Sequence, residues 1–134
     1  MNIPKYTKDL LENQKLCTMA TCWEDQPYLS LMNFTYVEAE NKVILSSRRD
    51  SKKYFNIEKN KYISLLLFSD ADKLSITFLG TAMTMAAEEE MHYREMHMKK
   101  NNMPQFILGK DIGLIIFSIE KIIVSDNQDQ VKYY

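Results

Sequence analysis

Short apolar runs separated by brief polar turns are the feature of this sequence that most constrains its fold. Each run is rich in β-branched and other apolar residues, as β-strands are. The predicted strands are Leu16–Trp23, Tyr28–Val37, Lys42–Ser47, Tyr62–Ser69, Leu74–Ala86 and Gly113–Ser125, with a short edge strand in the terminal DQVKYY. Helices do not alternate with these strands in a βαβ rhythm, so the pattern favours an antiparallel barrel over a doubly wound sheet.

Three segments between or beside the strands are predicted to be helical. They are Tyr6–Asn13, a short helix within residues 50–60, and Glu88–Lys100. Asp50 or Ser51 is a plausible N-cap of the short helix, and Phe55 and Ile57 would anchor it to the core. Gly80, in the middle of a long strand, predicts a bulge or a sharp bend. We therefore expect a mainly β fold with peripheral helices, a six- or seven-stranded antiparallel barrel.

The totals fit one domain, residues 1–134, without repeats or linkers. Lys+Arg 17 against Asp+Glu 18 leaves a net charge of -1, which argues against a general nucleic-acid or membrane-surface protein. No apolar run approaches the ~20 residues that span a bilayer, and the polar N-terminus does not resemble a secretory signal, so we expect a cytoplasmic protein.

Cys17 and Cys22 point to opposite faces of a predicted strand, which favours buried free thiols over a disulfide or a two-cysteine metal site.

Positive charge gathers in one place, LSSRRDSKKYFNIEKN, residues 45–60. A strand, a basic turn and a helix N-terminus follow one another here, and a helix start offers free amides and partial positive charge. Neighbouring Lys and Arg side chains and the hydroxyls of Ser46, Ser47 and Ser51 would complete a phosphate site. The alternative is a solvated surface turn. The sequence has no Walker-type or dinucleotide glycine pattern, so a nucleoside triphosphate or Rossmann site is not expected.

The order and spacing of these elements resemble the FMN-binding split barrel of the pyridoxamine 5′-phosphate oxidase-like superfamily. The resemblance rests on Ala20-Thr21 followed by EDQP, on Ser51-Lys52-Lys53 followed by Asn56 and Asn60, on YISLLLF, and on FLGTAM with Gly80 and Ala82. It covers roughly Leu10–Ala86. Lys61 stands where the family often has Pro, and Gln26 replaces a common turn glycine.

This resemblance implies an FMN site. The implied cofactor-binding residues are Leu31, Met32 and Asn33 along the flavin, Ser46, Ser47 and Arg48 at a strand end, and Ser51, Lys52 and Lys53 at the phosphate. It also implies a homodimer with two FMN sites at the subunit interface. Some members of the superfamily bind deazaflavin or haem instead.

The function that this resemblance implies is that of an FMN-dependent oxidoreductase acting on an unassigned small substrate, with hydride arriving from a nicotinamide or leaving to a small acceptor. The alternative is a non-catalytic flavin-binding or stress-related ligand-binding module. No catalytic acid or base is apparent. Authentic pyridoxamine 5′-phosphate oxidase activity is not expected, because no Arg or His follows Gly113 to bind that substrate.

Several other features have simpler interpretations. We interpret His92 and His97 as surface or interface residues that cannot form a joint ligand pair, which leaves one axial haem ligand open. Glu88, Glu89 and Glu90 are expected in solvent at a helix N-terminus, and no metal site is predicted. The methionines between residues 83 and 103 suit core packing and a subunit contact, with a flexible binding surface as the alternative. Trp23 and Tyr133-Tyr134 are expected at a barrel end or an interface, with flavin stacking as the alternative.

Overall fold

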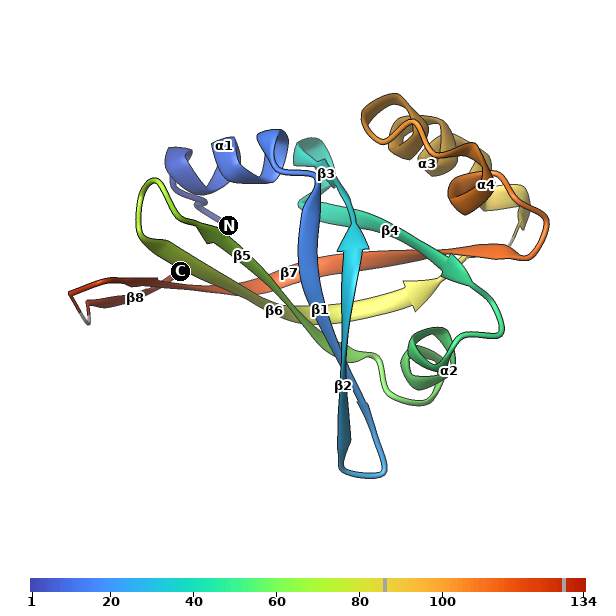
Figure 1. Ribbon diagram of the computed structural model, residues 1–134, viewed down its shortest axis with the longest axis horizontal. Helices are drawn as coiled ribbons and strands as arrows, with labels where there is room; N and C mark the ends of the chain where they lie inside the picture. Colours follow the sequence, from blue (N-terminus) through green and yellow to red (C-terminus); the bar gives the residue numbers. More distant parts are fainter. Residues whose placement is uncertain (86, 129) are drawn as a thin grey trace.

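One antiparallel sheet organises the computed structural model, which describes residues 1–85, 87–128 and 130–134, with the side chains of residues 87–89 outside that description (Figure 1). Within the described ranges the sheet has eight strands. They are β1 (Leu16–Trp23), β2 (Gln26–Asn33), β3 (Thr35–Val37), β4 (Lys42–Arg48), β5 (Tyr62–Ser69), β6 (Leu74–Thr84), β7 (Ile112–Asp126) and β8 (Val131–Tyr133). The order across the sheet is β2-β1-β5-β6-β7-β4-β3, and β8 pairs with β7. The mainly β architecture predicted from the apolar runs is confirmed.

The predicted strand Tyr28–Val37 is divided, which accounts for the eighth strand. β2 pairs with β1, whereas β3 pairs with β4, so the chain changes neighbours at Phe34. The Phe34 side chain is buried in the core. A strand that changes neighbours must interrupt its ladder, and residue periodicity alone does not show where this happens.

The first hairpin is tighter than predicted. The turn consists of Glu24 and Asp25, whose φ angles of 54° and 61° suit a two-residue turn of the primed type. Gln26 and Pro27, predicted as part of the turn, belong to β2. Proline is tolerated there because β2 lies at an edge of the sheet.

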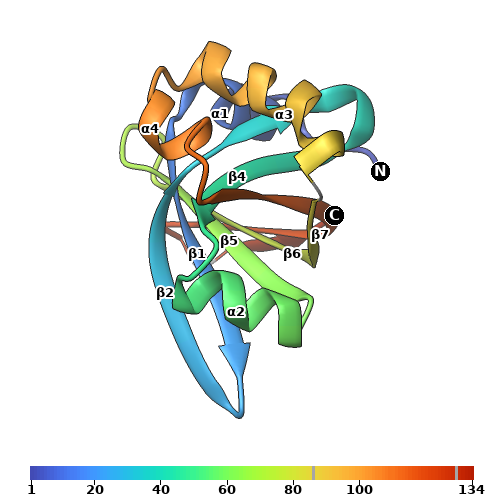
Figure 2. The same cartoon turned by 90° about the vertical axis from the view of Figure 1, so that its right-hand side faces the viewer.

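The described helices are α1 (Lys5–Asn13), α2 (Lys52–Lys59), α3 (Ala87–Lys100) and the short α4 (Pro104–Ile107), with a 3-10 turn at Glu38–Glu40. Figures 1 and 2 place α1, α3 and α4 on one side of the curled sheet and α2 on the other. α4 was not predicted, although Pro104 at its first turn is a common helix-start signal. None of the described helices is long and apolar enough to cross a membrane.

Two apolar clusters hold these elements together. The larger one fills the inside of the curled sheet and includes Met19, Phe34, Phe78 and Phe117. The smaller one joins Val37, Ile44, Leu114 and Ile116 of β3, β4 and β7 to Tyr93 and Met96 of α3. α3 therefore packs on the opposite face of β4 and β7 from the main core. This packing holds α3 against β3, β4 and β7.

The helix after β4 is anchored differently from the prediction. Ser51 is its N-cap and accepts a hydrogen bond from the Tyr54 amide at 3.2 Å, as one of the two predicted caps. Ile57 is buried as expected, but Phe55 is 42% exposed and packs edge-on against Trp23. Tyr54 fills the anchoring role instead. The Tyr54 ring packs on Gly113. A side chain at that position would clash, because a Cβ there would lie 2.6 Å from the ring.

The predicted bulge in the long strand is confirmed. The pairing of β6 with β7 shifts register between Leu79 and Gly80. A Cβ on Gly80 would lie 1.9 Å from the carbonyl oxygen of Ser118, so no larger residue fits without backbone movement. The cysteine prediction is confirmed in part: both thiols are free, Cys17 is buried, and Cys22 is half-buried.

Candidate functional site

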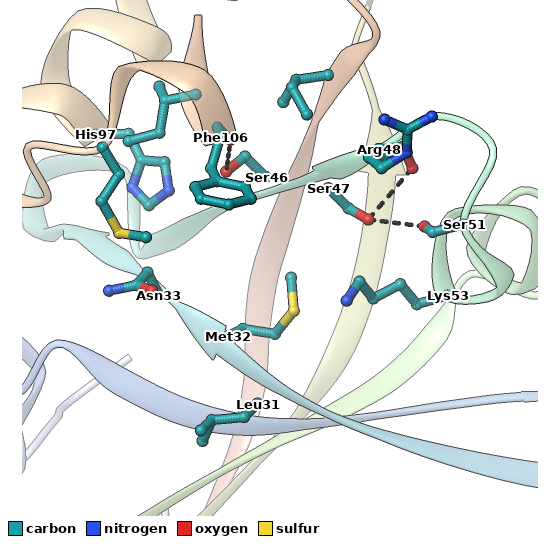
Figure 3. A pocket seen from close by; sticks show the side chains of 13 residues that line it. Leu31, Met32, Asn33, Ser46, Ser47, Arg48, Ser51, Lys53, His97 and Phe106 are labelled. Carbon is teal, nitrogen blue, oxygen red and sulfur yellow. Dashed lines mark hydrogen bonds between the residues drawn. The ribbon is translucent and has the colours of Figure 1, made fainter. Parts of the chain in front are cut away.

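A cavity of about 290 Å³ opens where β2, β4 and the start of α2 meet α3, α4 and the start of β7 (Figure 3). It is lined by eight of the nine residues predicted to bind the cofactor: Leu31, Met32, Asn33, Ser46, Ser47, Arg48, Ser51 and Lys53. The ninth, Lys52, is exposed, and its ammonium lies 5.9 Å from the centroid of the Tyr28 ring. The structure thus brings together three segments that the sequence separates by up to 22 positions, from Leu31 to Lys53.

The end of the cavity next to α2 is rich in hydrogen-bond donors. Ser47 Oγ lies 2.7 Å from Ser51 Oγ, and Ser47 Oγ also donates to the Arg48 carbonyl at 3.2 Å. The first turn of α2 adds free amides and the positive end of the helix dipole. Lys53 is half-buried and lines this end. Together these groups form a site that suits a phosphate or another compact anion.

The two arginines of the basic segment are engaged by carboxylates. Arg48 donates through Nε and Nη2 to Asp50, each at 2.9 Å. The hydrogen bond from Arg48 lowers the pKa of the Asp50 carboxyl below its usual value. Arg49 donates to the Ile112 carbonyl at 3.4 Å and reaches Glu90 at 3.5 Å. Of the predicted cations, Lys53 is therefore the one that lines the cavity with no ion pair to a described residue.

Glu90 is buried, which corrects the prediction of a solvated helix start; the side chains of Glu88 and Glu89 lie outside the described residues. Its carboxylate accepts hydrogen bonds from Arg94 and, at 3.3 Å, from the Leu114 amide. Arg94 also donates to the carbonyls of Ile107 and Ile112. A carboxylate can be buried here because its charge is paired and its oxygens are hydrogen-bonded. The pair fastens α3 to α4 and to the start of β7.

The other end of the cavity contains His97, which is fully buried within the chain and not a surface or interface residue as predicted. Its Nδ1 lies 2.7 Å from Thr35 Oγ1 and 3.3 Å from the amide nitrogen of Asn101. Asn101 Oδ1 in turn accepts from Asn33 at 3.2 Å. Burial, with a smaller contribution from nearby Lys100, lowers the pKa of His97 to about 4. The ring is therefore neutral at neutral pH. His92, by contrast, is exposed as predicted.

Sequence reasoning missed the wall that α3, α4 and β7 contribute. The missed residues are His97, Met103, Phe106, Ile107 and Ile112. One signal was available: Glu90, Arg94, His97 and Asn101 follow helical spacing and so share one face. A polar face on a surface helix is normally read as solvated, whereas here it faces the protein. Within the described ranges no group of three or more metal-ligating side chains is found.

Comparison with known proteins shows the family of the chain. The family model for pyridoxamine 5′-phosphate oxidase matches residues 3–124. A Schizosaccharomyces pombe protein described as a pyridoxamine 5′-phosphate oxidase homolog is 32% identical, over 93% of this chain and 86% of that protein.

Solved structures share the fold at low sequence identity. A heme binding protein from Mycobacterium smegmatis superposes with a TM-score of 0.79 at 14% identity; all of this chain matches 59% of that one. A Clostridium acetobutylicum protein related to general stress protein 26 gives 0.76 at 19%, over 96% of this chain and 91% of that one. An F420 reductase gives 0.73 at 15%, over 90% and 98%.

These matches confirm the split-barrel fold that the sequence resemblance implied. They agree with the family model, which spans nearly the whole chain. The chain therefore belongs to the pyridoxamine 5′-phosphate oxidase family.

Proposed function

We propose that this protein binds FMN in the cavity and acts as a flavin-dependent oxidoreductase on a small substrate. The observation that carries the proposal is the convergence of three predicted contact segments, on β2, β4 and α2, around one cavity. One end has the chemistry of an anion site, and the other has apolar walls with a few polar groups. That combination suits a planar ring joined to a phosphate.

The residues present fit the two parts of FMN. Lys53 would hold the phosphate beside the start of α2, and the Ser47 and Ser51 hydroxyls would turn from their present partners to donate to it. Met32, Met103 and Phe106 provide apolar contact for the ring. A volume of about 290 Å³ is at the lower limit of the ~300–1,000 Å³ typical of ligand sites. A ligand as large as FMN would therefore extend out of the cavity, past Leu31, whose side chain is 69% exposed.

A second subunit would cover that exposed part. Leu29 and Leu31 of β2 and Leu66 and Phe68 of β5 are exposed apolar residues. Thr18 of β1 pairs with Leu31 on one side and with Leu66 on the other, so the three strands present a common outward surface. Exposed apolar surface of this kind marks interaction sites. We propose that a second copy of this chain packs on it, and that the homodimer completes two flavin sites.

The bound flavin would supply the hydride and electron chemistry, with a nicotinamide as the electron donor. This chain's residues would bind the phosphate, orient the ring and exclude water from one of its sides. The family membership and the fold shared with an F420 reductase support a redox role. The fold shared with a heme binding protein and with a protein related to general stress protein 26 supports the second candidate, a non-catalytic binding module.

The test begins with the purified protein and added FMN. Retained yellow colour, or saturable quenching of flavin fluorescence, would support the site. Anaerobic titration with NADH and NADPH then separates the two candidates, because an oxidoreductase would bleach the flavin rapidly and a storage or sensing module would not. Titration with haem and with deazaflavin serves as the comparison. Folded protein that takes up no flavin in excess FMN would refute the proposal.

A further inference from the structure

One buried polar atom in the cavity wall has no partner. His97 is 0% exposed, and its Nε2 makes no hydrogen bond to any described residue. Leaving a buried polar atom unpaired costs free energy, and such atoms are rare in folded proteins. His97 lines the cavity, so a bound ligand is the group best placed to supply the missing partner.

The neighbours of the other ring nitrogen determine which proton His97 carries. The Asn101 amide nitrogen is fixed by donation to the Phe34 carbonyl at 3.1 Å, and the same nitrogen also faces Thr35 Oγ1 and His97 Nδ1. An unprotonated Nδ1 suits this arrangement, because Asn101 Nδ2 can only donate and the Thr35 hydroxyl, which accepts from Asn101, can donate to Nδ1, 2.7 Å away. We therefore assign the acceptor role to Nδ1. The neutral ring then carries its proton on Nε2.

The position of this N–H relative to the anion site suggests what it binds. Figure 3 shows His97 and Asn33 at one side of the cavity and Ser51 and Lys53 at the other. A ligand anchored by its phosphate near α2 would therefore present its distal heterocycle to His97. The chemistry required there is a hydrogen-bond acceptor, such as a carbonyl oxygen or an unprotonated ring nitrogen.

We propose that His97 is a ligand-binding residue whose Nε2–H donates a hydrogen bond to an acceptor atom on the heterocycle of the bound flavin. This inference rests on the proposed flavin function. The tautomer makes His97 a donor rather than a metal ligand, because coordination through Nε2 would require the proton to move to Nδ1, against the Asn101 amide. Phe106 also lines the cavity and is 54% exposed.

Nitrogen NMR of the wild-type chain with ¹⁵N-labelled histidine tests the donor directly. The sequence has 2 histidines, and the exposed His92 is removed by H92Q, which serves for assignment and as the matched control. We expect His97 to show a protonated Nε2 in the free protein, and we expect that resonance to shift when FMN is added. A protonated Nδ1, or an Nε2 signal unaffected by saturating FMN, would overturn the inference.

Variants test the contribution to binding. H97L should weaken FMN binding about fivefold, the usual value of one neutral hydrogen bond, whereas H92Q should leave it unchanged. H97Q retains an amide donor and should bind more tightly than H97L. With FMN labelled with ¹³C and ¹⁵N, H97L should shift the resonance of one acceptor atom. A structural role alone would lower the melting temperature without moving that resonance, which would contradict the inference.

The outcomes also separate this inference from the proposed function. If wild-type protein binds FMN and Lys53→Ala weakens it, but H97L does not, the flavin site stands and the His97 contact is wrong. If wild-type protein binds no flavin, both are wrong. If it binds haem instead, with His97 as the iron ligand, the absorption spectrum will show it, and the donor assignment is overturned.

Discussion

Removing the Lys53 ammonium tests whether the α2 end of the cavity holds a phosphate. Lys53 is half-buried and lines the cavity, whereas Lys52, its neighbour in sequence, is exposed and lies over Tyr28 outside it. The sequence alone gives both lysines the same role. The structure gives the two lysines different positions. Lys53→Ala and Lys52→Ala therefore remove the same charge, but only Lys53→Ala removes a side chain that lines the cavity.

The magnitude follows from the kind of contact. A hydrogen bond from an ammonium to a phosphate contributes about 1.5–3 kcal/mol. Because Lys53 is only half-buried, solvent and salt screen part of this, and we expect a loss near the lower limit. That corresponds to about tenfold weaker FMN binding for Lys53→Ala, since each 1.4 kcal/mol is a factor of ten. Lys52→Ala should change the affinity by less than about threefold, as rim charges usually do.

The assay is flavin fluorescence titration of both variants with FMN and with riboflavin, which lacks the phosphate. Combining the protein change with the ligand change gives a double-mutant cycle that isolates the Lys53–phosphate coupling. Lys53→Ala should lose affinity for FMN but not for riboflavin, and the loss should shrink as salt rises. Equal losses for both ligands, or a larger effect from Lys52→Ala, would refute the phosphate assignment.

Three further predictions concern stability and assembly. Gly80→Ala should destabilise the fold by about 1–3 kcal/mol in urea denaturation, because its Cβ would meet the Ser118 carbonyl. Leu31→Glu should convert the proposed homodimer to a monomer in sedimentation, while a dimer unchanged by the substitution would exclude β2 from the interface. The pKa of His97 is lowered from 6.5 to about 4 by burial, so the unfolded chain binds the extra proton. The free energy of unfolding should therefore be intact above pH ~6.5 and fall, by up to ~1.4 kcal/mol per pH unit, as pH drops toward 4; a His97 variant should lack this dependence.

The parts of the site that the sequence could predict are those formed by neighbouring elements. β4, its basic turn and α2 are consecutive, so a capping serine and a helix start could be placed from local signals alone. The part of the site on β2 was predicted from the family resemblance, because apolar periodicity does not show which strands lie side by side. The same limit explains the error at Phe34: the apolar pattern continues through it, while the hydrogen-bond partner changes.

The α3 and α4 wall could not be predicted because its contacts span long distances in sequence. Ser46 Oγ donates to the Phe106 carbonyl at 2.8 Å across 60 positions, and Thr35 meets His97 across 62. Glu90 and His97 are residue types that usually face solvent, and only their partners make burial tolerable. Without knowing that Arg94 and Thr35 stand opposite them, the solvated interpretation was the more reasonable one.

The basic run after β4 lies in a chain with a net charge of -1, and some of its cations are paired with carboxylates. Arg48 is neutralised by Asp50, and Arg49 and Arg94 share the buried carboxylate of Glu90. Of the five cations in residues 45–60, Arg48 and Arg49 therefore meet carboxylates, and Lys53 is the one that lines the cavity without an ion pair to a described residue. α3 supplies both His97, which lines the cavity, and Glu90, which binds Arg49, Arg94 and the Leu114 amide, so a change in this helix would alter the wall of the cavity. Ligand choice in this chain should depend on α3 and α4 more than on the barrel.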